Sequence, residues 1–524
     1  MMTLLVLALS ARAQDLPDHL LKLMYTGNII SRFYVDDADN DKIAEAGIRA
    51  MLKELDPHST YSDAKETKAL MEQMQGSFGG IGIQFNIASD TLYVIQTTAN
   101  GPSERAGILA GDKIVAVNDT VIAGVKMERS DIMSRLRGPK GTNVKLEVVR
   151  RGIDRKLLFN IVRDNISTET VDASYMIDKT NGYIRITSFG AKTHEEFVSK
   201  LDSLKALGMK NLILDLEGNG GGYLTAAVDI AGELIDEAKL VVYTEGKNNP
   251  RFDYISRGGG RFRKGNLVVM VDETSASASE ILAGAIQDWD RGVVVGRRSF
   301  GKGLVQCPFQ LPDGSMIRLT IARYYTPTGR CIQKPYDNDS VSYEDDLMHR
   351  YNHGEMTSAD SIHFPDSLKT YTLRLKRPVY GGGGIMPDYF VPVDTLKYTK
   401  YHRALSAKGC IIQTSLRYLD ENRSLLVSKY KDIEDFDKRF TVSDAYMAML
   451  REQGVKDSVK LSGGEEEFER SRPELAKQLK MLIARDLWDM SDFMMIYNRT
   501  SDNFKKAYEL IQVKNHDKLL MKEK

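Results

Sequence analysis

The sequence has few of the residues that fix a fold or a chemistry by themselves. Its 524 residues include only three cysteines, Cys307, Cys331 and Cys410, in no metal-like spacing. An odd number this low excludes a disulfide framework and leaves at most one bridge, which the sequence does not assign. The eight histidines are scattered, and His194-Glu195-Glu196 lacks the second histidine of a zinc-protease helix. The sequence therefore predicts no metal site and no cofactor.

An excess of charge of one sign is also lacking. Lys+Arg and Asp+Glu are balanced at 72 each, so nothing in the charge favours a nucleic-acid partner. A hydrophobic content of 42% with 27% charged residues is typical of folded, soluble protein. The length predicts three or four domains rather than one.

Long apolar runs are absent, because no segment approaches the length needed to span a bilayer. The first residues, MMTLLVLALSARAQDLP, contain a short apolar run followed by Ala11-Arg12-Ala13, a small-x-small cleavage pattern. This pattern predicts a signal peptide over 1–13, although the usual basic residues before the apolar run are missing. The alternative is a frayed apolar terminus. We expect a periplasmic or otherwise exported protein that has no transmembrane segment after cleavage.

Both ends of the remaining chain carry helical periodicity. Residues 14–75 and 401–524 have apolar residues three and four apart, which predicts two helical regions. In the second region, Ser471-Arg472-Pro473-Glu474 has the pattern of a helix start. These regions are suited to contacts in a homo-oligomer.

Residues 76–164 resemble a PDZ domain. The short strand-like runs GSFGGIGIQFN, TLYVIQTT, DKIVAVNDT and NVKLEVVR are separated by Gly, Asn and Asp. The Gly79-Gly80-Ile81-Gly82 turn would be the carboxylate-binding loop, since successive N–H groups in a glycine-rich loop form a nest for an anionic C-terminus. The adjacent strand edge would then pair with a peptide backbone. The resemblance implies that the partners are C-termini of proteins or peptides.

Over 165–400 strands and helices alternate. GYIRITSF, NLILDLEGNGGG, NLVVMVDE and RGVVVGRR are strand-like, and helical patterns lie between them. Such alternation predicts an α/β domain with a largely parallel sheet covered by helices. The polar segment 335–372 is predicted to be a surface insertion in this domain.

The stretch TSASASEILAGA, from Thr274 to Ala285, carries the main chemical question. By itself it is a helix start, because Ser277 and Glu280 fit a capping box and Ser275 can also cap. However, a buried strand leads directly into the serines, which is how nucleophilic serines are presented. The glycine-rich turn of DLEGNGGG follows another strand and could provide an oxyanion donor.

A serine nucleophile needs a base, and no histidine follows a strand in a suitable turn. A lysine can replace histidine where burial lowers its pKa from about 10.4 towards neutrality. Lys302 lies between glycines in SFGKGLVQ, and Gln306 could orient its amine. The sequence therefore offers a Ser-Lys dyad with a supporting glutamine.

SASASEILAGAIQD together with FGKGLVQ resembles the two catalytic motifs of the carboxy-terminal processing peptidases, also called tail-specific proteases. LDPHSTY, GSFGGIGI, ARYYTPTGRCIQ and GGIMPDYFV match other marks of the family, so the resemblance runs from about residue 50 to 395. It implies a crotonase/ClpP-like α/β catalytic core, with an inserted PDZ β-domain and helical N- and C-terminal regions.

The resemblance also assigns roles to individual residues. It implies that the middle serine, Ser277, is the nucleophile of an acyl-enzyme mechanism, with Lys302 as general base and Gln306 as its support. The implied oxyanion hole consists of the Ala278 amide and a glycine amide, from Gly221 or Gly222. Ser275 and Ser279 remain candidates on local grounds.

The chain departs from the family pattern at two positions. Glu217 stands where the family usually has arginine, and Gly220 where it often has proline. We expect these changes to alter the stability or regulation of the turn rather than remove the chemistry. The predicted function is a serine endopeptidase that recognises the C-terminal tails of exported proteins. The alternative is a catalytically silent, peptide-binding scaffold.

Overall fold

The computed structural model describes residues 17–521 apart from 89, 99, 258, 337–342 and 344. The predicted signal peptide, 1–13, lies outside these described residues. The described residues divide into two compact units, the first formed by 17–68 with 305–322, 336, 343, 345 and 346, and the second by the remainder. No helix among the described residues is both long enough and apolar enough to cross a membrane.

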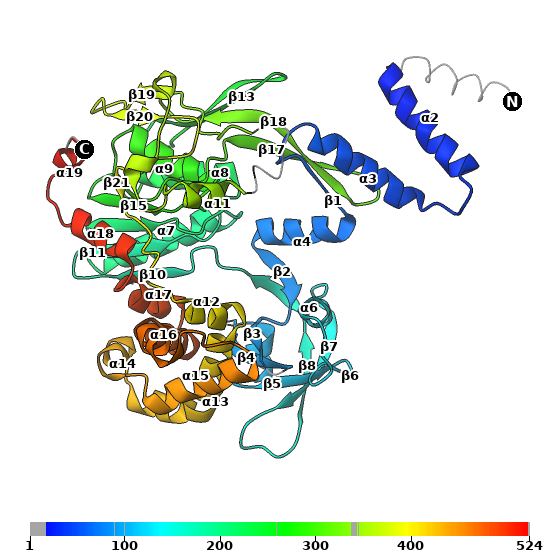
Figure 1. Cartoon of the computed structure of the whole chain (residues 1–524), viewed down its shortest axis with the longest axis vertical. Coiled ribbons are helices and arrows are strands. Elements are labelled where there is room, and N and C mark those ends of the chain that lie inside the picture. Colours follow the sequence, from blue (N-terminus) through cyan, green and yellow to red (C-terminus); the bar gives the residue numbers. More distant parts are fainter. Residues whose placement is uncertain are drawn as a thin grey trace. The chain divides into compact units, whose positions relative to one another are not determined.

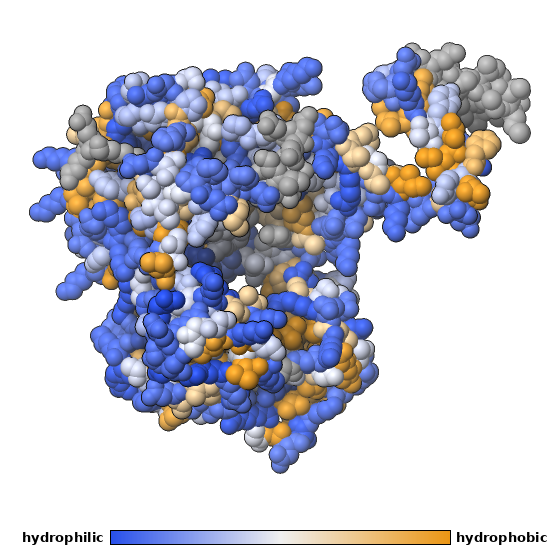
Figure 2. All heavy atoms as spheres, in the orientation of Figure 1, coloured by the Kyte–Doolittle hydropathy of each residue, from blue (hydrophilic) through white to orange (hydrophobic). Residues whose placement is uncertain are grey.

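The first unit contains two helices, a short paired strand and segments of two longer strands. Its elements are α2 (Asp18–Phe33), α3 (Asn40–Lys53) and β1 (Thr60–Ser62), which is antiparallel to the first half of β18 (Met316–Tyr325). None of the residues of α2 is buried, and Figure 2 shows apolar side chains exposed along this helix. The oligomer predicted from the helical ends stays a prediction.

The second unit contains an antiparallel β-domain in the region that resembles a PDZ domain. Its sheet has the order β3-β4-β5-β7-β8, with β6 beside β5, and β2 pairs with β9 in a separate ribbon. Because β3 pairs only with β4 among the described residues, it is an edge strand. The elements are β2 (Ser77–Gly80), β3 (Ile83–Ala88), β4 (Thr91–Thr97), α5 (Pro102–Ala106), β5 (Lys113–Val117), β6 (Thr120–Val121), α6 (Arg129–Leu136), β7 (Asn143–Val149), β8 (Leu157–Val162) and β9 (Asp164–Ser167).

The predicted α/β domain is built on a sheet with the order β10-β11-β12-β15-β16-β21. Figure 1 labels β10, β11, β15 and β21 of this sheet. Only the β10–β11 pair is antiparallel, so the sheet is largely parallel, as predicted. All residues of β15 and β16 are buried, which explains their continuous apolar sequences. The strands are β10 (Ala173–Met176), β11 (Asn181–Arg185), β12 (Asn211–Asp215), β15 (Leu267–Val271), β16 (Val293–Gly296) and β21 (Tyr389–Phe390).

Helices from two distant parts of the chain cover this sheet. The crossover helices α7 (Thr193–Ala206), α8 (Leu224–Leu234) and α9 (Ala278–Asp288) follow the strands in sequence. A second group comes from the end of the chain, and consists of α17 (Met490–Asn498), α18 (Asp502–Ile511) and α19 (His516–Leu520). Phe504, Leu510 and Ile511 of α18 share one core cluster with residues of the buried strands. The C-terminal helices therefore complete the core of the α/β domain.

The other C-terminal helices form a bundle with its own hydrophobic core. They are α12 (Lys400–Ala407), α13 (Cys410–Lys429), α14 (Ile433–Arg439), α15 (Asp444–Lys456) and α16 (Gly464–Leu487). The predicted helix start at Ser471 is wrong, because α16 runs through it with Pro473 inside. Ser471 donates to the carbonyl of Glu467 and bonds Thr399, which directly precedes α12, so its hydroxyl serves packing and not a cap.

Short elements complete the two units. The hairpin of β13 (Leu240–Gly246) and β14 (Asn249–Ile255) pairs with the end of β18, and β17 (Leu304–Gln310) also pairs with β18. The predicted insertion contains α11 (Asp346–Asn352), η1 (Ala359–Ser361), η2 (Asp366–Leu368) and β19 (Lys369–Tyr371), which pairs with β20 (Pro378–Tyr380). It is not wholly superficial, because Arg350 is buried and donates to the carbonyls of Arg298 and Ser299. The remaining helix, α4 (Ala64–Gln75), joins the units.

Candidate active site

Ser277 lies where a buried strand gives way to a helix. It follows β15 and precedes Ala278, the first residue of α9. Its φ of +57° and ψ of −112° are rare for a residue with a side chain, so this backbone is strained. The side chain is half-buried, whereas the residues around it are buried. A strained strand-to-helix turn with an accessible hydroxyl is the arrangement that presents a serine nucleophile.

The neighbouring serines have structural partners instead. The hydroxyl of Ser275 donates to the carbonyl of Leu216 at 2.8 Å, and that of Ser279 donates to the carbonyl of Asn219 at 2.9 Å. Both side chains are fully buried. They fasten the serine turn to the glycine-rich turn, which leaves Ser277 as the serine available to a substrate.

The glycine-rich turn approaches the serine turn so closely that it requires glycine. Gly221 has a φ of +100°, and a Cβ on it would stand 2.7 Å from the Cβ of Ser277. Its N–H donates to Asn219 Oδ1 at 2.8 Å and is therefore occupied. Among the described residues, the N–H groups of Gly222 and Ala278 have no such backbone or side-chain acceptor. Ala278 is at the first position of α9, where helical N–H groups lack intrahelical partners.

Glu280 connects the serine turn to the lysine segment. Its Oε2 accepts the N–H groups of Ser277 at 2.8 Å and Lys302 at 2.9 Å. Its Oε1 accepts the Ser299 hydroxyl at 2.6 Å and the Gly301 N–H at 2.7 Å. Burial raises the pKa of Glu280 to about 7, and the four hydrogen bonds oppose that rise because they favour the ionised form.

Tyr324 of β18 contacts the same two backbone segments from their carbonyl side. Its hydroxyl lies 3.1 Å from the carbonyl oxygen of Ser277 and donates to that of Lys302. The ring is only 1% exposed. The sequence pattern did not single out this tyrosine, and it treated Glu280 only as half of a capping box. Their roles arise from contacts between segments that are distant in the sequence.

The predicted base, Lys302, and its predicted support, Gln306, lie in different compact units. Lys302 is half-buried between two buried glycines, Gly301 and Gly303, in the same unit as Ser277. Gln306 lies in β17, which from Val305 onwards belongs to the other unit. Its Nε2 is buried and has no hydrogen-bond acceptor among the described residues. The support of Lys302 by Gln306 therefore stays a prediction.

The predicted carboxylate-binding loop is shorter than the sequence indicated. Gly79 and Gly80 belong to β2, where they pair with Asn165 and Asp164, so only Ile81 and Gly82 lie between strands. Gly79 is fixed by packing, since its carbonyl accepts the N–H of Gly138 and a Cβ on it would stand 2.2 Å from the Gly138 carbonyl oxygen. Ile81 and Gly82 directly precede the edge strand β3.

A helix that the sequence pattern did not predict lies beside β3, the edge strand of this domain. α6 packs on the same core as β3 through Ile132 and Leu136. The guanidinium of Arg129, at its start, lies 5.1 Å from the centre of the Phe85 ring on β3. An edge strand beside a helix, with a glycine turn at the start of the strand, suits an added peptide strand.

Comparison with protein families gives three matches. Residues 180–341 match peptidase family S41, residues 79–161 match the PDZ domain, and residues 401–489 match a family of unknown function, DUF8443. The first two matches confirm the resemblance and the fold class predicted from the sequence.

Two relatives found by sequence similarity agree with these matches. The chain is 32% identical over 366 residues to a carboxy-terminal-processing protease of Bartonella bacilliformis, covering 68% of this chain and 83% of the relative. It is 36% identical over 302 residues to the carboxy-terminal processing protease CtpA of Bacillus subtilis, covering 57% and 64%. The solved PDZ domain of a carboxy-terminal protease from Vibrio cholerae, in complex with peptide, is 32% identical, covering 17% and 97% of the two chains with a TM-score of 0.16.

Proposed function

This chain belongs to peptidase family S41, with the carboxy-terminal-processing proteases, and we propose that it is a serine endopeptidase that cleaves exported proteins after recognising their C-terminal tails. The observation that carries the proposal is the shared acceptor of Ser277 and Lys302. One buried carboxylate oxygen accepts the N–H groups of both residues. Their backbones are therefore held in a fixed relation, as a nucleophile and its base require.

The proposed reaction begins with attack of Ser277 Oγ on the carbonyl carbon of the scissile peptide bond, while the neutral amine of Lys302 takes the hydroxyl proton. The N–H groups of Ala278 and Gly222 stabilise the oxyanion. The tetrahedral intermediate then collapses to an ester on Ser277, and the ammonium of Lys302 gives its proton to the leaving amine. Water, deprotonated by the same lysine, attacks the ester, releases the new carboxyl end and restores the serine.

Tail recognition is assigned to the PDZ domain. The N–H groups at Ile81 and Gly82 would bind the terminal carboxylate. The edge of β3 that pairs with no other described strand would pair with the last residues of the substrate. Export to the periplasm is part of the same proposal, and its support is the apolar N-terminal sequence.

The alternative, a silent peptide-binding scaffold, is disfavoured. Its expected mark is a missing serine, lysine or glutamine, but Ser277, Lys302 and Gln306 are all present. The similarity to processing proteases also favours a peptidase.

The experiment compares wild type, Ser277→Ala and Lys302→Ala on an unfolded protein that ends in apolar residues, offered with a free or an amidated C-terminus. We expect only wild type to cleave it, and to cleave the amidated form more slowly. Ser275→Ala is a matched control for the removal of a hydroxyl from this turn.

Each part of the proposal has its own contradicting result. Cleavage by Ser277→Ala would remove the nucleophile assignment, and equal cleavage of both substrates would remove recognition of the carboxylate. If wild type is as inactive as both variants on every substrate, the scaffold replaces the peptidase.

A further inference from the structure

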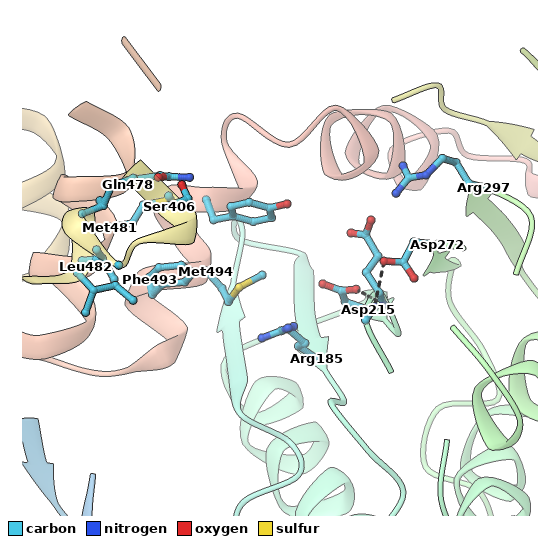
Figure 3. Close-up of a pocket in the computed structure, with 16 residues that line it drawn as sticks. Arg185, Asp215, Asp272, Arg297, Ser406, Gln478, Met481, Leu482, Phe493 and Met494 are labelled. Atoms are coloured by element: carbon cyan, nitrogen blue, oxygen red, sulfur yellow. Dashed lines mark hydrogen bonds between the residues drawn. The ribbon is translucent and has the colours of Figure 1, made fainter. Parts of the chain in front are cut away.

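A cavity of about 520 Å³ lies within the second compact unit, between strand ends of the α/β domain and the C-terminal helices (Figure 3). One wall is polar and comes from the strand ends of the α/β domain, where Arg185, Asp215, Asp272 and Arg297 gather. The opposite wall is mainly apolar and comes from the C-terminal helices. This volume is typical of sites for small organic ligands.

The charges of the polar wall do not balance. Three carboxylates, those of Asp215, Glu217 and Asp272, line the cavity with two guanidinium groups. Both guanidinium groups already have another carboxylate partner: Arg185 bonds Asp172 at 2.9 Å, and Arg297 bonds Glu273 at 2.5 Å. The polar wall therefore carries an excess of acidic groups, which favours a cation over an anion.

Glu217 is the carboxylate with a free acceptor. Its Oε1 accepts the side-chain amide of Asn503 at 2.7 Å, but no hydrogen bond among the described residues involves Oε2. Both oxygens of Asp215 accept hydrogen bonds, from the Tyr183 hydroxyl and the Glu217 N–H. Both oxygens of Asp272 also accept hydrogen bonds, from the N–H groups of Gly218 and Thr274. Burial and the repulsion of Asp215 and Asp272 raise the pKa of Glu217 well above its usual value. Without a cation beside it Glu217 therefore favours its protonated form, and a ligand cation would favour the ionised carboxylate.

The rest of the cavity limits what that cation can be. No group of three His, Cys, Asp or Glu residues in the described part of the chain has the geometry to hold a metal ion. The facing wall presents Leu482, Phe493 and Met494, which would contact an apolar body rather than a hydrated ion. The two walls together fit one molecule with a charged end and an apolar end.

We propose that this cavity binds an organic ammonium group attached to an apolar body, with the ammonium at Glu217 and the body between Leu482, Phe493 and Met494. A free alkylamine and a lysine side chain flanked by apolar residues share this chemistry. The site is separate from the substrate's scissile bond, and its occupancy does not depend on peptidase activity.

The cavity contacts the loops that shape the active site. Gly218 follows Glu217 in the glycine-rich turn, and its N–H donates to Asp272 Oδ2 at 3.1 Å. Asp272 begins the turn that leads to Ser277, and Arg297 lies five residues before Lys302. A bound ammonium would therefore lie beside residues of the glycine-rich turn and of the turn that leads to Ser277. We expect its binding to change the peptidase rate.

The binding test uses the full chain carrying Ser277→Ala and isothermal titration calorimetry with n-octylammonium. We expect n-octylammonium to bind at least tenfold more tightly than octanoate. Glu217→Gln is expected to weaken n-octylammonium at least tenfold, and Phe493→Ala to weaken it as well. Glu237→Gln, which removes an exposed carboxylate elsewhere, is the matched control and is expected to leave binding unchanged.

A second arm separates the two sources of the ammonium. The peptide acetyl-Leu-Lys-Leu-amide is compared with acetyl-Leu-Gln-Leu-amide, and tighter binding of the lysine peptide than of n-octylammonium would identify a polypeptide as the ligand. Octanoate binding as tightly as n-octylammonium, or no binding of any ammonium probe, would overturn the proposal. The comparison of octanoate with n-octylammonium needs no cavity variant. It therefore tests the preference for an ammonium group even if Glu217→Gln fails to fold.

Discussion

The N–H of Ser277 and the N–H of Lys302 donate to one atom, Oε2 of Glu280, at 2.8 and 2.9 Å. The two residues are 25 positions apart in the sequence, so a single buried carboxylate sets the distance between their backbones. The other oxygen of the same carboxylate holds Ser299 and Gly301, on the approach to Lys302. Glu280 is thus a positioning residue for the proposed dyad.

Replacing Glu280 with Gln is expected to lower kcat by about 100-fold, because displacement of reacting groups by about 1 Å has effects of this size. In glutamine an NH2 group replaces one carboxylate oxygen, and this group cannot accept the hydrogen bonds that the oxygen accepted. The measurement is steady-state cleavage of an unstructured peptide. An unchanged kcat in a folded Glu280→Gln protein would show that Glu280 does not position the dyad.

The pH dependence follows from the raised pKa of Glu280, which is about 7 against a usual 4.5. Only the ionised carboxylate accepts all four hydrogen bonds, so kcat is expected to fall as the pH drops below about 7. The folded protein holds this proton more tightly than the unfolded chain. Protonation of Glu280 therefore stabilises the folded protein fully below about pH 4.5, and this stabilisation is lost as the pH rises through about 7.

The test is a kcat profile and a series of urea unfolding curves between pH 5 and 8. For Glu280→Gln, we expect the stability slope across this range to become smaller. A slope equal to that of wild type would assign the titration to another group.

Two serines in one turn are expected to respond differently to loss of the hydroxyl. Ser277→Ala should abolish cleavage and leave the melting temperature nearly unchanged, since its side chain is half-buried. Ser275→Ala should destabilise the protein by about 1–3 kcal/mol, because it leaves a buried carbonyl, that of Leu216, without its donor. Thermal unfolding and peptide cleavage are measured on both. The reverse pattern would make Ser275 the nucleophile.

Two glycines of one turn form a matched pair. At Gly221, alanine would put its Cβ 2.7 Å from the Ser277 Cβ, at a φ that L-residues rarely adopt. At Gly220, a Cβ meets nothing within 4 Å. We expect Gly221→Ala to lose at least about 100-fold in kcat/KM and Gly220→Ala to keep activity within about threefold. Equal activity of the two variants would contradict the close packing of the turns.

The C-terminal helices are expected to be necessary for the stability of the α/β domain. Phe504 is 7% exposed, packs on the sheet, and lies 5.8 Å from Tyr183 between ring centres. Phe504→Ala should therefore cost about 3–5 kcal/mol of unfolding free energy. Phe252→Ala, at a ring that is 59% exposed, is the control and should cost less than about 1 kcal/mol. Equal losses would mean that α18 does not stabilise the sheet.

The sequence by itself determined the parallel α/β domain, the PDZ domain and the turn that carries Ser277. These features leave local signals, because buried parallel strands are continuously apolar and tight turns need glycine. The helix start predicted at Ser471 was wrong because a local signal was overridden by tertiary packing. α16 packs against α12 and continues through Ser471, with Pro473 inside the helix.

Only the tertiary structure revealed Glu280 and Tyr324, which both contact the backbones of Ser277 and Lys302, and the cavity between the strand ends and the C-terminal helices. Each depends on segments that are far apart in the chain and meet only after folding, and no periodicity or spacing encodes such meetings. The same holds for the three serines, whose sequence pattern is symmetrical. Burial and hydrogen bonds to the glycine-rich turn distinguish Ser275 and Ser279 from Ser277, because a hydroxyl already bonded in the core is not available to a substrate.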